Sequence, residues 1–132
     1  MNTKEINLFE KTQAQLEGLL TEVTILSKKS PNDGVNKFKL KFINEIISSS
    51  NELLGNTYKP LDSFEQFEED DLPSNSDVTF ILTQYINCFE KMRADNIMRE
   101  KRYDGNKYFY EWYWVIGNEV SNIKTASPKK IK

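Results

Sequence analysis

Side chains that could perform acid–base or metal chemistry are concentrated in one stretch. Residues 62–71 read DSFEQFEEDD, with six carboxylates and no base. Carboxylate oxygens suit Mg²⁺ and Ca²⁺, but the glycine and alternating ligands of a calcium-binding loop are missing. The alternatives are therefore a solvated acidic surface or a surface that steers a basic protein partner by long-range attraction. The candidate partner-binding residues are Glu65, Glu68, Glu69, Asp70 and Asp71.

Other residue types that catalysis uses are scarce. The chain has no histidine, which excludes Ser-His-Asp and Cys-His triads and histidine-ligated metals. The one cysteine, Cys88, lies on an apolar helical stripe, where a thiol packs as a small hydrophobic group. No glycine-rich phosphate-binding motif occurs. We therefore expect a protein that is not an enzyme and uses no cofactor and no metal ion.

The C-terminal third combines aromatic and basic side chains. Tyr110, Trp112 and Trp114 are candidate anchors for a protein partner, because aromatic residues dominate the binding energy of many interfaces. The alternative is a surface for single-stranded nucleic acid, on which rings stack with bases and cations follow the phosphates. The residues of this alternative are Arg99, Lys101, Arg102, Lys107, Tyr108, Lys124, Lys129 and Lys130.

Three helices must position these groups. Apolar residues recur at intervals of three and four over 3–28, over 35–54 and from 74 to about 99, which predicts amphipathic helices. Asn2 and Glu5 are spaced as a capping box for the first helix. The connection 56–75 is long, but Leu61, Phe64 and Phe67 are spaced by three and should dock on the helices.

After the third helix the pattern changes to that of a strand. Aromatic and β-branched residues alternate along 107–116, Gly117-Asn118 suits a hairpin turn, and 120–126 suits a weaker return strand. A two-stranded hairpin is marginal by itself, so one aromatic face should lie on the bundle. The predicted fold is mainly α: a three-helix bundle with an acidic excursion between helices two and three and a C-terminal β-hairpin. We expect one domain over 1–126 and a basic tail over 127–132.

Charge and hydropathy limit the compartment and the function. The 132 residues carry a net charge of −2, and acidic residues at Glu5 and Glu10 interrupt any signal-peptide pattern. The longest apolar run, 112–116, is too short to cross a membrane. We expect a cytoplasmic, protein-binding module of the inhibitor, antitoxin or immunity-protein kind, with no membrane association. The broad apolar helix faces could also build a homodimer.

Overall fold

Three helices are followed by a three-stranded antiparallel sheet. The computed structural model describes residues 1–129. The sheet has the order β1-β2-β3, so each strand pairs with its neighbour in the chain. The elements are α1 (Thr3–Lys29), α2 (Lys37–Tyr58), a 3₁₀ turn η1 (Glu69–Asp71), α3 (Asn75–Asp95), β1 (Ile97–Tyr103), β2 (Tyr108–Ile116) and β3 (Glu119–Thr125).

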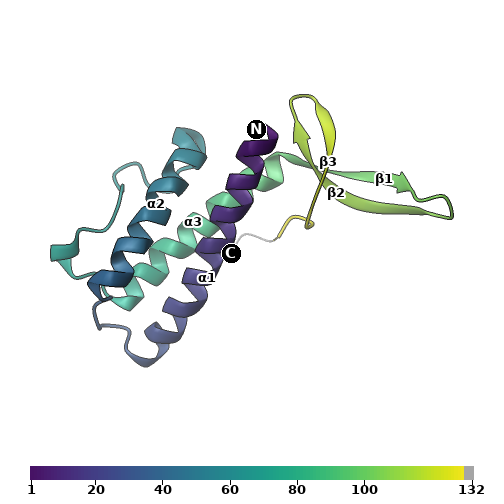
Figure 1. Cartoon of the computed structure of the whole chain (residues 1–132). Helices are drawn as coiled ribbons and strands as arrows, with labels where there is room; N and C mark the ends of the chain where they lie inside the picture. Colours follow the sequence, from purple (N-terminus) through teal and green to yellow (C-terminus); the bar gives the residue numbers. More distant parts are fainter. Residues whose placement is uncertain (130–132) are drawn as a thin grey trace.

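The direction of the helices explains the long second connection. A short link turns the chain from α1 into α2, which runs back alongside it, and α3 then runs in the same direction as α2 (Figure 1). Two parallel neighbours require the chain to return along the bundle, which is what residues 59–74 do. The return ends where the backbone of Val35 donates to the carbonyl of Pro73 over 2.9 Å.

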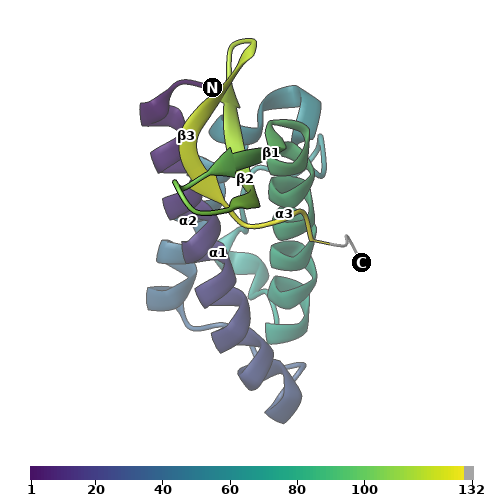
Figure 2. The same cartoon turned by 90° about the vertical axis from the view of Figure 1, so that its right-hand side faces the viewer.

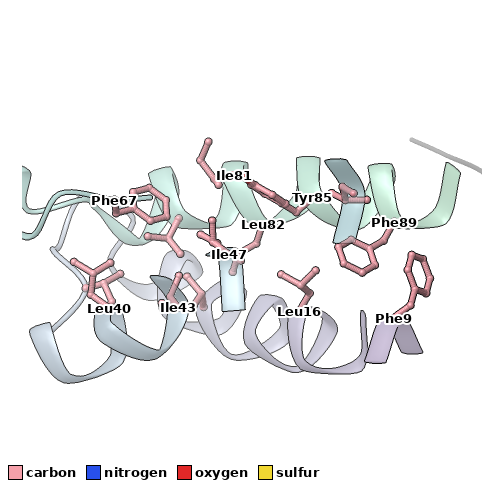
Figure 3. Close-up of a cluster of buried hydrophobic side chains, with 14 of the residues drawn as sticks. Phe9, Leu16, Leu40, Ile43, Ile47, Phe67, Ile81, Leu82, Tyr85 and Phe89 are labelled. Atoms are coloured by element: carbon pink, nitrogen blue, oxygen red, sulfur yellow. The ribbon is translucent and has the colours of Figure 1, made fainter. Parts of the chain in front are cut away.

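The apolar stripes of the three helices meet in a core along the bundle (Figure 3). Phe9 of α1 and Phe89 of α3 pack with ring centroids 4.7 Å apart. Phe67 joins this core from the connection between α2 and α3. The largest fully buried aliphatic side chains are Ile6, Leu16, Val23, Leu40, Ile43, Ile47, Val78 and Leu82.

Helix ends agree with the predicted boundaries at α1 and differ at α2. The Asn2 side chain accepts from the Glu5 backbone over 2.8 Å, and Glu5 accepts from the Asn2 backbone, so the predicted capping box is present. The predicted second helix, 35–54, begins two residues later and continues for one more turn after Gly55. Gly55 itself leaves helical geometry, with φ of +62°. Gly55 therefore forms a kink within α2, whereas the sequence predicted that the helix ends there.

The third helix is shorter than predicted, and a strand replaces its last turn. Helix α3 ends at Asp95, and residues 97–103 form β1, which pairs with β2 from Ile97 opposite Trp114 to Tyr103 opposite Tyr108. The predicted two-stranded hairpin is therefore β2 and β3 of a three-stranded sheet. The shift of apolar register at Ile97 marks the change from helix to strand.

One end of the sheet packs on the bundle and the other projects from it. Trp114 is fully buried and meets the Phe9 ring edge-on at 5.3 Å. Trp112, Ile116 and Ile123 also pack against the core. From there the β1–β2 hairpin extends away from the helices (Figure 1), and in the perpendicular view it lies in front of the bundle (Figure 2). The predicted docking of one aromatic face therefore holds only at the base of the hairpin.

Candidate functional site

The acidic segment is held on the bundle by side chains of α2. Asn44 accepts from the Phe67 backbone nitrogen and donates to the Phe67 carbonyl, both over 2.9 Å. Asn51 donates to the Glu65 carbonyl over 3.1 Å and accepts from the Tyr85 hydroxyl. Two amides of one helix thus supply the hydrogen bonds that a β-strand partner would give, so this irregular backbone has a defined position.

Aromatic side chains also hold the same segment against α3. Phe64 packs edge-on against Phe67, with ring centroids 5.1 Å apart, and lies 6.4 Å from the ring of Tyr85. Burial raises the pKa of Tyr85 to about 12, against the opposing effect of its hydrogen bond to Asn51. The Tyr85 hydroxyl therefore stays protonated and serves as a structural donor.

The carboxylates of this segment fall into two groups. Glu65 pairs with Lys59, so its charge is compensated. The other four candidates, Glu68–Asp71, are exposed, and no basic side chain of residues 1–129 pairs with them. We call these four residues, together with Asp77 in the first turn of α3, the acidic end.

An apolar groove lies beside the acidic end. Its volume is about 530 Å³, and Asp71 and Asp77 stand at its border. Phe80 projects there with 59% of its surface exposed. The apolar residues that line the groove are Phe64, Phe67, Pro73, Phe80 and Ile81.

Leu72 adds a second exposed apolar side chain beside the acidic turn, with 65% of its surface exposed. Its backbone is left-handed, with φ of +48°, which is strained for a residue with a bulky side chain. Sequence reasoning missed both Leu72 and Phe80. The available signal was that Phe80 falls off the apolar stripe of α3, so a large ring had to face solvent.

The β1–β2 hairpin carries a second surface. Directly paired residues lie on the same face of a sheet, and the side chains of each strand alternate between faces. Arg99 and Lys101 of β1 therefore share a face with Tyr108 and Tyr110 of β2. The Arg99 guanidinium lies 4.2 Å from the centroid of the Tyr110 ring, and the Lys101 ammonium 4.4 Å from that of Tyr108. Tyr103 extends this face to the tip of the hairpin, where the centroids of the Tyr103 and Tyr108 rings lie 4.9 Å apart.

We call Arg99, Lys101, Tyr103, Tyr108 and Tyr110 the aromatic–cationic face. The three tyrosines expose between 56% and 63% of their surface. Within residues 1–129 no carboxylate pairs with either cation of this face or with Lys107 near its tip.

Cations on the opposite face of the sheet are compensated. Arg102 lies over the Tyr113 ring and pairs with Glu100 over 2.9 Å. Lys124 pairs with Glu111 over 2.9 Å, and this hydrogen bond raises the pKa of Lys124. The candidate nucleic-acid residues therefore do not form one patch, since Lys129 also pairs with Glu17. Lys130 lies outside the described residues.

The predicted aromatic anchors separate in the same way. Trp114 is a core residue, and its indole nitrogen donates to Glu10 over 2.7 Å. It is therefore not an anchor for a partner, although it lies on the same side of β2 as Tyr110. Trp112 is half-buried at the base of the sheet. Only Tyr110 of the three is well exposed.

The acidic end and the aromatic–cationic face lie at opposite ends of the molecule (Figure 1). The acidic end adjoins the first turn of α3, and β1 follows its last turn. The 21 residues of α3 place these ends about 30 Å apart. The acidic carboxylates and Tyr110 therefore cannot contribute to one continuous contact with a small partner.

The remaining features to consider are the cysteine thiol, possible metal ligands and possible membrane-spanning helices. Burial raises the pKa of the Cys88 thiol, which disfavours the reactive thiolate. In the described part of the chain, no group of three or more acidic or cysteine side chains is arranged to hold a metal ion. The helices within that part are all too short or too polar to cross a membrane.

Comparison with known proteins finds no family model that matches the chain and no significant similarity to a curated protein or a solved structure.

Proposed function

We propose that the protein is a non-enzymatic module that binds a basic protein partner at its acidic end. The observation that carries this proposal is the groove between the acidic turn and α3. Exposed Phe80 lines this groove, and exposed Leu72 follows the acidic turn next to it in the chain. Beside them stand four carboxylates that no base of the described chain compensates. Apolar anchors rimmed by charge are typical of protein-binding surfaces.

The two kinds of residue have separate roles in this proposal. The carboxylates raise the rate of encounter with a basic surface, and this effect weakens as salt increases. Phe80 and Leu72 bury apolar surface after docking, so they set the rate of dissociation. The fixed position of the segment on Asn44 and Asn51 supports the proposal, because little backbone ordering is left to oppose binding.

The test uses charge reversal at the acidic end. The protein captures its partner from a lysate of the native host, and the purified pair is then measured by stopped-flow kinetics at several salt concentrations. We expect Glu68→Lys, Glu69→Lys and Asp70→Lys together to slow association by roughly tenfold at low salt and to flatten its salt dependence. An association rate that this variant leaves unchanged would contradict the proposal.

A matched control variant has the same net charge as the triple variant but carries the reversed residues elsewhere. Glu45, Glu52 and Glu119 are exposed and are not among the residues that line the groove, and their reversal to lysine changes the net charge by the same amount. This control variant should associate nearly as fast as the wild type. Phe80→Ser should instead leave association unchanged and raise the dissociation rate by roughly tenfold or more.

A further inference from the structure

We infer that the aromatic–cationic face of the β1–β2 hairpin binds single-stranded nucleic acid, independently of the acidic end. Three observations carry this inference: the state of its cations, the exposure of its rings and its distance from the acidic end.

The cations of this face are free to meet phosphates. Arg99 and Lys101 contact tyrosine rings and no carboxylate of the described chain, whereas Arg102 and Lys124 on the opposite face are paired. Lys107, just before β2 at the tip of the hairpin, is also unpaired within the described chain, so this end of the hairpin offers three positive charges. Such a local patch can bind a polyanion although the whole chain has a net charge of −2.

The rings and the guanidinium offer flat surfaces to bases. Tyr103, Tyr108 and Tyr110 are more than half exposed, although Lys101 and Arg99 lie over the rings of Tyr108 and Tyr110. Arg99 lies over Tyr110, so its planar group extends the stacking surface instead of blocking it. Unstacked bases are available in single strands and are hidden inside a duplex, which favours a single-stranded ligand.

Distance keeps the acidic end from repelling a polyanion at this face. The two surfaces are separated by about the length of α3, roughly 30 Å, while the screening length at physiological salt is only about 8 Å. An acidic protein could use the cations equally well but would not need exposed stacking surfaces. The tyrosines therefore favour a nucleic acid over an acidic protein.

The experiment measures fluorescence anisotropy of a labelled oligothymidylate of about twelve nucleotides, titrated with the full chain at low salt. We expect the logarithm of affinity to fall with the logarithm of salt with a slope of about −2, since three cations meet a single strand. Absence of binding at about 20 mM salt and about 100 µM protein would overturn the inference. It would leave the proposal for the acidic end intact, because that surface takes no part in this assay.

Two matched double variants locate the site. Arg99→Gln with Lys101→Gln should weaken binding by roughly tenfold and reduce the salt slope. Arg102→Gln with Lys124→Gln removes the same charge from the opposite face and should change affinity less than about twofold. Equal losses in both double variants would overturn the assignment of the face.

The tyrosines separate stacking from simple attraction between charges. Tyr108→Ser with Tyr110→Ser leaves the charge unchanged and alters exposed rings, so the variant should fold, as circular dichroism would verify. We expect it to lose roughly tenfold or more in affinity for the oligothymidylate. Poly-glutamate serves as the polyanion without bases. If it competes as well as the oligonucleotide does, or if the tyrosine variant binds normally, base stacking is refuted and the inference fails.

Discussion

Glu90 and Arg93 form an ion pair inside the protein, one turn apart on α3, with only 4% and 3% of their surfaces exposed. Arg93 also donates to the Thr125 hydroxyl over 2.8 Å and to the carbonyls of Ala126 and Ser127. Glu90 accepts from the backbone nitrogen of Lys129 over 2.8 Å. The pair therefore fastens the end of β3 and the chain after it to the bundle. Two of these residues, Ser127 and Lys129, lie in the stretch that the sequence predicted as a basic tail.

Removal of one partner of this pair should be costly. Arg93→Met leaves the Glu90 carboxylate buried without its countercharge, and breaking a buried ion pair in this way costs about 3–5 kcal/mol in the free energy of unfolding. Urea denaturation followed by circular dichroism measures the loss. Glu90→Leu combined with Arg93→Met removes both charges and should be less destabilised than Arg93→Met alone. A double variant that is less stable than the single variant would contradict this account.

The same carboxylate predicts how stability depends on pH. Burial alone would raise the pKa of Glu90, but hydrogen bonds from Arg93, the Lys129 backbone and Gln13, with the charge of Arg93, hold it below its ordinary value of 4.5. The stabilisation is therefore complete above about pH 4.5 and is lost as pH falls through the folded-state pKa. The difference in unfolding free energy between the wild type and Glu90→Gln should shrink below pH 4.5. A difference that stays constant down to about pH 2 would refute this role.

Local sequence patterns were sufficient for the helices, because each helix buries its own periodic apolar stripe, and for β2, because aromatic and β-branched residues alternate along it. They were insufficient for β1, whose sequence IMREKRY has no apolar alternation. That strand exists because the aromatic side chains of β2 supply its partners: Arg99 and Lys101 cover Tyr110 and Tyr108. A contact between strands cannot be read from one strand alone.

The candidate surfaces show the same limit. The charge of Glu68–Asp71 was sufficient to predict exposure, since unpaired carboxylates stay in water. The alternation of side chains along the strand predicted that Tyr110 and Trp114 lie on one face of β2. It did not indicate which end of that face the bundle covers. Trp114 is buried and Tyr110 is exposed because the bundle ends between them.

Two glycines should respond to alanine in opposite directions. Gly55 has φ of +62°, so a Cβ there strains the backbone, and Gly55→Ala should lower the unfolding free energy by about 1 kcal/mol or more. Gly18 lies inside α1 with no heavy atom within 4 Å of a Cβ position. Gly18→Ala should raise the unfolding free energy by up to about 1 kcal/mol. Urea denaturation of both variants checks the signs, and a stabilising Gly55→Ala would show that the kink is not required.

Cys88 should react slowly in the folded protein. Burial raises the pKa of its thiol above the ordinary value of 9.0, so very little thiolate is present at neutral pH. Alkylation by iodoacetamide, followed by mass spectrometry, should be roughly tenfold or more slower in buffer than in urea. Equal rates in the two solvents would mean that the thiol is freely accessible.

The bond from Trp114 to Glu10 should control how the sheet is attached to the bundle. Trp114→Phe removes the indole donor and part of the ring that meets Phe9, so we expect a loss of about 1–3 kcal/mol in unfolding free energy. Because the chain has two tryptophans, the variant retains only half-buried Trp112. Its emission should therefore move to longer wavelength than that of the wild type. Glu10→Gln keeps an acceptor for the indole and should cost less than Glu10→Ala, which leaves the buried donor unpaired. Equal stability of the two Glu10 variants would show that the hydrogen bond does not contribute to docking of the sheet.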